Sequence, residues 1–257
     1  MTTRSRGAFR LSSERVIIAA VRSVITYIAV SVYVLFAASI GMLLEMIFRW
    51  KGILYILGHG GVRLGLATAG IKYRVAGKEN LPLTRAAVYC ANHESNVDPP
   101  VLFTALHPRM HIVYKAEIDA IPLLARAFRH GGFVPIDRRN KEAAMRSLEA
   151  GARSIREGNS FLIFPEGTRS KTAEMLPFKK GGFLMALKAQ APIVPVAISG
   201  GRAAMRKGSA IVRPVDISIR VGAPIETAGM QMSDRDTLIA TVRARIESLL
   251  AEGPVID

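Results

Sequence analysis

Cysteine is nearly absent from the 257-residue sequence, and motifs for metals and nucleotides are missing as well. The single Cys90 excludes a disulfide within the chain, and its place in an apolar stretch predicts a small buried side chain in a reducing compartment. The sequence has no P-loop and no GxGxxG, and no zinc-type spacing joins its five histidines, His59, His93, His107, His111 and His130. We therefore expect neither a bound metal ion nor a bound cofactor.

Acidic residues are few, because 20 Asp and Glu stand against 35 Lys and Arg and leave a formal net charge of +15. Such a charge favours an anionic partner, meaning a nucleic acid, an anionic lipid surface or a phosphorylated substrate. Aromatic residues make up only 7% of the chain, and no nucleic-acid recognition motif is present. We therefore expect membrane lipids, and not nucleic acid, as partners.

Residues 23–48 form a 26-residue apolar run in which Glu45 is the one charged residue. At about 1.5 Å per residue, such a helix can cross a hydrocarbon core of about 30 Å. Both flanks are basic, so the charges do not choose an orientation. Residues 52–71 form a second, glycine-rich apolar stretch that contains His59 and Arg63. We expect a helical hairpin, with 1–70 as a basic membrane-associated segment and 71–257 as the catalytic domain; alternatively, 52–71 is an ordinary core helix.

From residue 71 onward, short β-rich stretches alternate with helical ones. The predicted strands are 71–75, 87–91, 111–114, 132–136, 161–164, 193–199 and 215–221. The predicted helices are 100–106, 122–129, 141–157, 180–190 and a closing helix over 233–251, with Ser233 as its N-cap and Asp236 three residues on. This alternation predicts an α/β fold with a mixed, largely parallel sheet flanked by helices.

Residues 92–98, with the sequence NHESNVD, follow a predicted buried strand and hold a histidine and an aspartate five positions apart. In open α/β sheets, ligands bind at the carboxyl ends of the strands. Free imidazole has a pKa near ~6.5 and can accept a proton at physiological pH, and a carboxylate on its other nitrogen fixes the tautomer. His93 and Asp98 are therefore candidates for a general-base pair that acts on a hydroxyl. Structurally, Asp98 before Pro99 can instead be a helix N-cap.

Three further blocks follow in order, GFVPIDR at 132–138, FPEGTR at 164–169 and IVPVAI at 193–198. Together with residues 92–98 they resemble the glycerolipid acyltransferase family, specifically the 1-acyl-glycerol-3-phosphate acyltransferases. The blocks of that family read NHxxxxD, a glycine-aromatic stretch ending in arginine, FPEGTR and an apolar strand with VPV. The resemblance covers roughly residues 70–220, and Val134-Pro135 departs mildly from the plain apolar pair that the family more often has.

The resemblance implies an O-acyltransferase of phospholipid biosynthesis. It would transfer a fatty acyl chain from a thioester to the 2-hydroxyl of 1-acyl-glycerol 3-phosphate and so form phosphatidic acid. His93 would remove the hydroxyl proton, Asp98 would orient His93, and the oxygen would attack the thioester directly. Ser95 and Cys90 invite an acyl-enzyme alternative, but neither lies in a GxSxG context. Backbone amides after His93 or around Gly167 are candidate donors to the oxyanion.

The resemblance also implies which residues bind the acceptor's phosphate and glycerol. Arg169 is the first candidate for the phosphate, because a guanidinium fork binds phosphate in a bidentate manner, and a glycine lets the backbone approach a ligand closely. Glu166 would contact the glycerol or position the loop, although it could instead pair with Arg169 at the surface. The full set of candidate binding residues is Lys115, Arg138, Glu166, Gly167, Thr168 and Arg169.

The resemblance leaves the donor open between acyl carrier protein and coenzyme A as thioester carriers, and both are co-substrates, not bound cofactors. The expected partners are membrane lipids, lysophosphatidic acid and, as a candidate, acyl carrier protein. The expected location is the cell inner membrane, with the catalytic domain facing the cytoplasm. Two alternatives remain: an acyltransferase of this fold that acts on another lysolipid, such as a lyso-amino-lipid, and a non-catalytic basic lipid-binding protein.

Overall fold

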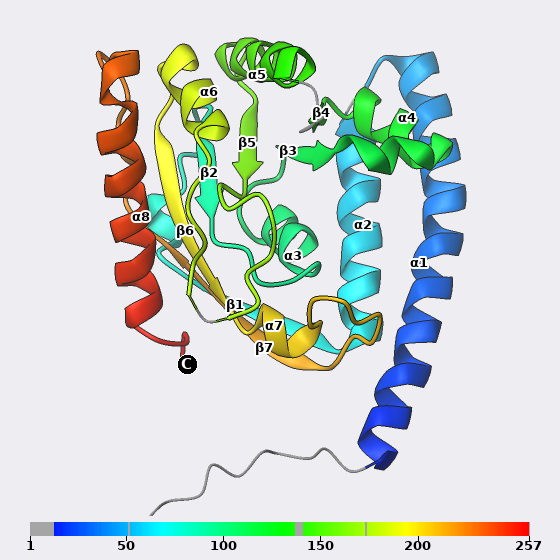
Figure 1. The fold of residues 1–257 in the computed structure, drawn as a ribbon. Helices are drawn as coiled ribbons and strands as arrows, with labels where there is room; N and C mark the ends of the chain where they lie inside the picture. The colour runs from blue at the N-terminus through cyan, green and yellow to red at the C-terminus, as the bar shows by residue number, and fades with distance from the viewer. Residues whose placement is uncertain (1–12, 51, 137–140, 173, 257) are drawn as a thin grey trace, which may run out of the picture.

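The fold is built on one seven-stranded sheet, and the computed structural model describes residues 13–50, 52–136, 141–172 and 174–256 (Figure 1). The strands are β1 (Ile71–Ala76), β2 (Val88–Ala91), β3 (Met110–Lys115), β4 (Val134–Ile136), β5 (Ser160–Ile163), β6 (Ile193–Ser199) and β7 (Val215–Val221). Their order is β1-β7-β6-β2-β5-β3-β4, and neighbours run parallel except β6 and β7. This confirms the predicted mixed, largely parallel sheet.

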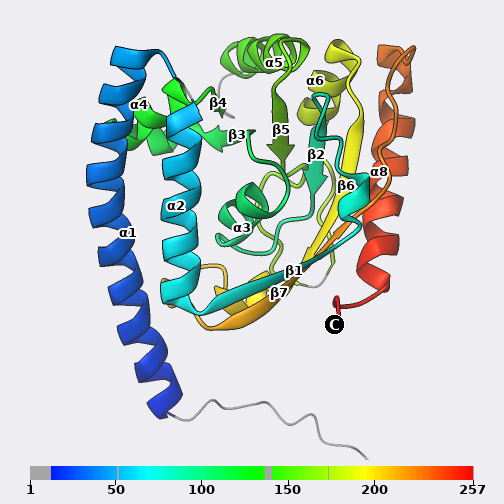
Figure 2. The ribbon, with the colours of Figure 1, turned by 180° about the vertical axis from the view of Figure 1, so that it is seen from behind.

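Helices cover both faces of the sheet (Figures 1 and 2). They are α1 (Ser13–Phe48), α2 (Gly52–Ala69), α3 (Asp98–Ala105), α4 (Pro122–His130), α5 (Lys141–Arg156), α6 (Gly181–Ala189), the short α7 (Gly201–Ala204) and α8 (Arg235–Ala251). Three 3-10 turns lie at Lys78–Asn80, Ala116–Ala120 and Met232–Asp234. Buried residues of α2 and α3 pack on one face, and buried residues of α5, α6 and α8 pack on the other.

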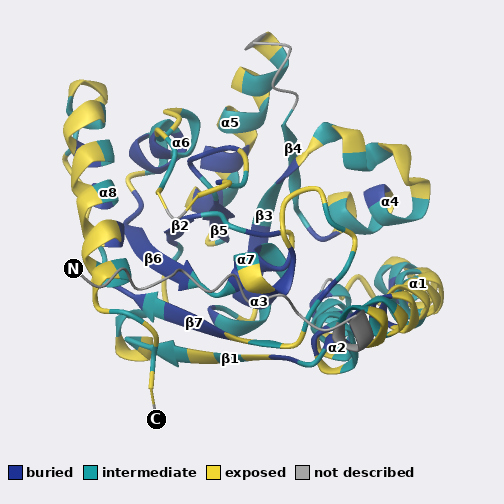
Figure 3. Ribbon diagram, turned by 60° about the horizontal axis from the view of Figure 1, so that its bottom comes forward, coloured by how far each residue is buried: buried dark blue, intermediate teal, exposed yellow. Residues whose placement is uncertain are grey.

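Strand β2 lies inside the sheet and shows why its sequence is continuously apolar. Successive side chains point to opposite faces of a strand, so Tyr89 and Ala91 join the α2/α3 core while Val88 and Cys90 join the α5/α6/α8 core. All four residues are fully buried, and Figure 3 shows the central strands as the buried part of the molecule. A parallel strand covered on both faces needs apolar residues at every position.

The parallel pairing brings the predicted motifs together. In register, Cys90 of β2 lies beside Ile163 of β5 and Pro195 of β6, and these three strands point the same way. Strands β3 and β4 are parallel to β5 as well. The segments that follow the five strands therefore emerge at one edge of the sheet, where α/β proteins bind their ligands.

Helices α1 and α2 lie side by side and run in opposite directions (Figures 1 and 2). Within the described residues, Val16–Phe48 is the one helix long and apolar enough to cross a membrane. Large apolar side chains are exposed along α1, among them Ile18, Val21, Ile25, Ile28, Val32, Leu35, Phe36, Ile40 and Leu43. Helix α2 instead buries Tyr55 and Leu66 against the sheet domain. It therefore forms the layer between α1 and that domain.

The start of α8 differs from the prediction. The expected N-cap, Ser233, is wrong, because the chain first makes the 3-10 turn Met232–Asp234 and α8 begins at Arg235. The capping box lies two residues earlier, where Gln231 and Asp234 bond reciprocally and the Gln231 amide donates to Asp234 Oδ2 at 2.7 Å. A glutamine side chain can accept from the N3 amide as serine does, so it satisfies the free donors of this turn.

Candidate active site

The turn that carries the histidine is fixed to β6 by Asn92. The Asn92 side chain donates to the Ile198 carbonyl at 2.8 Å and accepts from the Ile198 amide at 2.8 Å. The Asn92 side-chain amide thus takes the place of a backbone hydrogen-bonding partner for β6, just beyond the end of β2. Sequence reasoning assigned Asn92 no role of its own, and only its place directly after a strand could have suggested this one.

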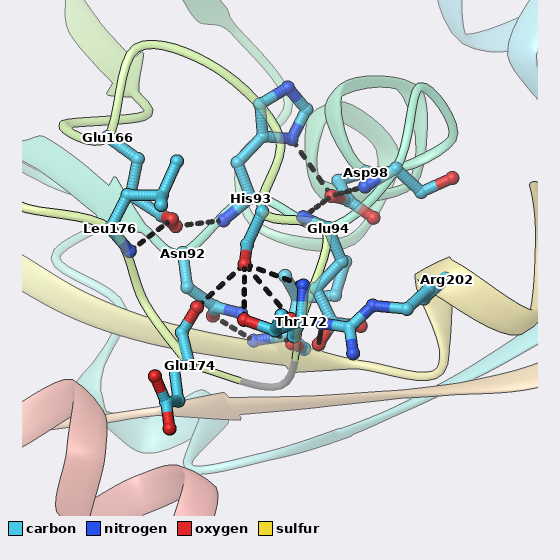
Figure 4. A network of polar contacts seen from close by, with 12 residues as sticks. Asn92, His93, Glu94, Asp98, Glu166, Thr172, Glu174, Leu176 and Arg202 are labelled. Carbon is cyan, nitrogen blue, oxygen red and sulfur yellow. Dashed lines mark hydrogen bonds and ion pairs between the residues drawn. The ribbon is translucent and has the colours of Figure 1, made fainter. Parts of the chain in front are cut away.

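His93 and Asp98 form a hydrogen-bonded pair, drawn in Figure 4, with 2.9 Å between His93 Nδ1 and Asp98 Oδ2. The same oxygen accepts from the amides of Glu94 and Ser95, both at 2.7 Å. Three donors converge on one fully buried carboxylate oxygen, so the aspartate cannot turn away from the ring. Because Nδ1 donates to Asp98, the neutral imidazole keeps the lone pair of Nε2 for an incoming hydroxyl proton.

The orientation of the imidazole is restrained from a second side. The ring of Phe164, the first residue of the FPEGTR block, stacks on His93 with centroids 4.2 Å apart and planes 29° apart. The second ring nitrogen points away from Asp98 (Figure 4). A base that is fixed in tautomer and direction is the arrangement that proton abstraction requires.

The structural alternative for Asp98, helix capping, does not match its contacts. Helix α3 begins at Asp98 itself, and its N-cap position, Val97, has no side-chain cap bond. The Asp98 carboxylate bonds only residues that precede the helix, at positions 93 to 95. Its contacts therefore serve the histidine turn and not the helix.

Glu166 holds two loops together. Its Oε1 accepts from the His93 amide at 2.7 Å, and its Oε2 accepts from the Leu176 amide at 2.8 Å (Figure 4). The residue is 2% exposed. Both carboxylate oxygens are thus engaged by backbone amides, and of the two roles expected for Glu166 these contacts support positioning of the loop.

The FPEGTR loop carries the candidate phosphate-binding groups. Gly167 has φ +70°, in the left-handed region, and Lys179 packs where a Cβ would lie. Arg169 is half-buried, and its Nη1 is buried without a hydrogen-bond partner among the described residues. Thr168 Oγ1 accepts from Lys207 at 3.2 Å. A guanidinium nitrogen that is withdrawn from water and left unpaired is suited to receive an anion.

Of the two remaining candidate cations, the structure describes only Lys115. Lys115 is the exposed last residue of β3, and it is in register with Ile136 of β4. It therefore lies at the same edge of the sheet as the other motifs. Arg138 falls within residues 137–140, outside the described part of the chain.

Helix α7, which follows β6, closes the site beside Asp98. A Cβ on Gly201 would overlap Asp98 Oδ1, so only glycine permits this approach. Arg202 Nη2 donates to Glu94 Oε1 at 3.2 Å, as Figure 4 shows. Burial raises the pKa of Glu94, and the charge of Arg202 opposes that shift. Sequence reasoning missed both α7 residues, since no motif marks them and only the pairing of β6 with β2 brings them here.

The two residues that could form an acyl-enzyme are poorly placed for it. The Ser95 hydroxyl is fully buried and donates to the Met205 carbonyl at 2.8 Å. Cys90 is fully buried within β2, and burial raises the pKa of its thiol. Neither has the exposed, activated position that a nucleophile requires.

An apolar cavity of about 580 Å³ lies next to the histidine turn. It extends between α1, α2, α3 and α4, and Asn96, Val97, Pro99 and Pro100 of the turn line one side of it. Its volume falls within the roughly 300–1,000 Å³ typical of ligand sites. A long alkyl chain fits this combination of shape and polarity. Among the described residues, no group of three or more His, Cys, Asp or Glu could hold a metal ion.

A model of the family described as "Acyltransferase" matches residues 72–199. A 1-acyl-sn-glycerol-3-phosphate acyltransferase of Limnanthes douglasii is 33% identical over 206 residues, which are 78% of this chain and 73% of the relative. One of Cocos nucifera is 38% identical over 178 residues, 69% of this chain and 56% of the relative. The crystal structure of a 1-acyl-sn-glycerophosphate acyltransferase from Thermotoga maritima superposes with a TM-score of 0.80 at 23% identity, over 93% of this chain and 98% of that one.

These matches, on a fold and site of this kind, show that the chain belongs to the glycerolipid acyltransferase family and is an O-acyltransferase. Members of this family take the acyl group from a donor co-substrate and need no bound cofactor. Within the family, the relatives that the chain resembles are the 1-acyl-sn-glycerol-3-phosphate acyltransferases, as the sequence blocks predicted. Family membership also removes the alternative of a non-catalytic lipid-binding protein.

Proposed function

We propose that the chain transfers a fatty acyl group from a thioester to the 2-hydroxyl of 1-acyl-glycerol 3-phosphate and forms phosphatidic acid. The observation that carries this proposal is the His93–Asp98 pair, in which Nδ1 is held by a buried carboxylate. It lies between an apolar cavity suited to a lipid chain and a loop with the unpaired guanidinium nitrogen of Arg169. The names of the relatives indicate the same acceptor.

The reaction needs one proton transfer in each direction. His93 Nε2 takes the proton of the acceptor hydroxyl while the oxygen attacks the thioester carbonyl carbon. The carbon–sulfur bond then breaks, and the imidazolium returns its proton to the departing thiolate. Asp98 stabilises the imidazolium between these steps, because its Oδ2 stays bonded to Nδ1.

Three of the amides near the site that could have stabilised the oxyanion already have partners within the protein. The amides of Glu94 and Ser95, which follow His93, donate to Asp98, and the amide of Gly167 donates to the Phe164 carbonyl at 3.0 Å. These three amides are therefore engaged within the protein. The other amides around Gly167 remain the candidate donors to the oxyanion.

The choice of acceptor rests on charge. A lyso-amino-lipid lacks a phosphate monoester, so it would leave the buried Arg169 Nη1 without an anion. A phosphate monoester offers three acceptor oxygens and about 1.5 to 2 negative charges, which suits the basic edge formed with Lys115. The acceptor with the phosphate is therefore the one that the site favours.

We expect the purified chain in mixed micelles to form phosphatidic acid from a labelled acyl-thioester and 1-acyl-glycerol 3-phosphate. The assay has two donor arms, acyl carrier protein and coenzyme A loaded with the same chain, and whichever supports turnover is the donor. A lyso-amino-lipid serves as the alternative acceptor. Product from that lipid alone would overturn the proposed acceptor while leaving the reaction class intact.

We further propose that α1 lies within one leaflet of the cell inner membrane, with the catalytic domain on the cytoplasmic side. The helix is joined to α2 near one end and to the domain near the other, since Arg22 Nε donates to the Thr68 carbonyl at 2.8 Å and His130 pairs with Glu45 at 3.1 Å. These contacts are separated by roughly 35 Å of helix at 1.5 Å per residue. A perpendicular α1 would draw the polar domain into the hydrocarbon, which leaves backbone groups unsatisfied.

Labelling of single cysteines tests this orientation, because the one native thiol, Cys90, is fully buried. We expect a membrane-impermeant maleimide to label Ser5→Cys, which precedes α1 in the sequence, and Trp50→Cys, which follows it, from the same side of sealed vesicles. Both should react in inverted vesicles and neither in right-side-out vesicles. Labelling of the two positions from opposite sides would show that α1 crosses the membrane.

A further inference from the structure

The segment 201–213, which contains α7 and the loop after it, touches the catalytic turn at one end and α1 at the other. Near its start, Gly201 packs on Asp98. Near its end, the Val212 amide donates to Ser23 Oγ at 2.8 Å, and the Tyr27 hydroxyl donates to the Ala210 carbonyl at 2.6 Å. The segment is thus held at both ends, and Lys207 lies between them.

Lys207 is an exposed lysine with a fixed ammonium group. Its Nζ donates to Thr168 Oγ1 at 3.2 Å and to the Arg169 carbonyl at 2.9 Å. An ammonium has three N–H donors, so one remains for a ligand. Among the described residues no carboxylate pairs with Lys207. The ammonium is thus anchored to two successive residues of the FPEGTR loop.

Two cations therefore meet at the FPEGTR loop, one that belongs to it and one that is bonded to it from the segment 201–213. Arg169 supplies a guanidinium with a buried unpaired nitrogen, and Lys207 brings an ammonium to the backbone of the same residue. An anion bound at this loop can be neutralised by both groups, because each carries a positive charge and a free N–H donor. A phosphate monoester has enough charge and oxygens for both cations, whereas a phosphodiester has one charge and two free oxygens.

We propose that Lys207 is a further phosphate-binding residue, beside Arg169 and the candidate Lys115, and that with Arg169 it selects an acceptor that carries a phosphate monoester. This inference rests on the proposed function and deepens it by assigning acceptor specificity to a residue outside the four sequence blocks. The guanidinium holds two phosphate oxygens, and the ammonium holds the third. Lysolipids with a phosphodiester head group are discriminated against because they cannot engage both cations fully.

The test compares Lys207→Met with Arg206→Met, which removes the same charge from the neighbouring exposed residue. For Lys207→Met we expect the apparent KM for 1-acyl-glycerol 3-phosphate to rise about tenfold, with kcat and the donor KM within twofold of wild type. The preference for this acceptor over 1-acyl-glycerol 3-phosphocholine should fall by a similar factor. Lys207→Arg should restore part of the acceptor affinity and part of the acceptor preference. Arg206→Met should leave the acceptor KM, the donor KM, kcat and the acceptor preference within twofold of wild type.

Arg169→Ala provides the comparison within the site. It should raise the acceptor KM more than Lys207→Met does, and the double variant should raise it by less than the product of the two effects, because both residues bind one group. An unchanged acceptor KM in Lys207→Met overturns the inference. So does a joint fall of kcat and thermal stability without a change in acceptor preference, which would make Lys207 a structural residue. If wild type forms no product from 1-acyl-glycerol 3-phosphate, the proposed function fails and the inference with it.

Discussion

The His93→Ala variant is expected to lose acyl transfer by about 10³-fold or more. General-base catalysis by a positioned side chain contributes roughly 10² to 10⁴ in rate, and among the contacts described here only His93 presents a base held by a buried carboxylate. Initial rates in mixed micelles measure the loss, with single-turnover assays to detect residual activity. Lysolipid binding should persist, since the cavity and the FPEGTR loop are unchanged.

His107→Ala is the matched control for this prediction. It removes an imidazole from the loop before β3, at the amino-terminal end of that strand and away from the motifs. Its turnover should stay within a few-fold of wild type, apart from any loss of folded protein, which thermal unfolding reports. Full activity in His93→Ala would disprove the proposed mechanism.

The second large effect is expected for Asp98→Asn, with kcat reduced about 10²- to 10⁴-fold and the acceptor KM nearly unchanged. The amide has the shape of the carboxylate, but it is neutral and cannot stabilise the imidazolium; in serine proteases the corresponding change lowers kcat by about 10⁴. Steady-state kinetics with both substrates varied separates the two parameters.

Asp98→Ala provides the contrast to Asp98→Asn. It leaves the three donors on residues 93 to 95 without their acceptor, in a place with little water, and each such loss costs about 1–3 kcal/mol. Its melting temperature should therefore fall below that of Asp98→Asn. A kcat for Asp98→Asn within twofold of wild type would show that the charge of Asp98 has no part in catalysis.

The seven strands were predictable because each is a short stretch rich in apolar residues and bounded by turns, with alternating charged or polar residues in β1 and β7, and β6 and β7 were predicted with their observed limits. Strand β4 begins at Val134, two residues later than expected, because Gly132 adopts φ +81° in a turn. The His93–Asp98 contact was also predictable, since a motif holds both residues within five positions. Local pattern and close spacing were sufficient in these cases.

The parts of the site that were not predicted depend on long-range pairing. Glu94 meets Arg202 across 108 positions of sequence, and Thr168 meets Lys207 across 39. The contacts arise because β6 lies next to β2, an order that hydrophobic patterns do not reveal. The cavity depends likewise on how α1 packs on the domain, and the burial of Glu166 depends on the loop that ends at Leu176.

The attachment of α1 along the domain bears on where the enzyme meets its acceptor, in the membrane or in the surrounding water. If α1 lies in one leaflet, as proposed, the apolar cavity beside it opens to the same two-dimensional phase in which lysolipid and product are dissolved. Acceptor supply is then set by the mole fraction of lysolipid in that leaflet and by lateral diffusion, and the volume of the surrounding water does not enter. Product would return to the leaflet from which the acceptor came, so each turnover would add one acyl chain to that leaflet alone.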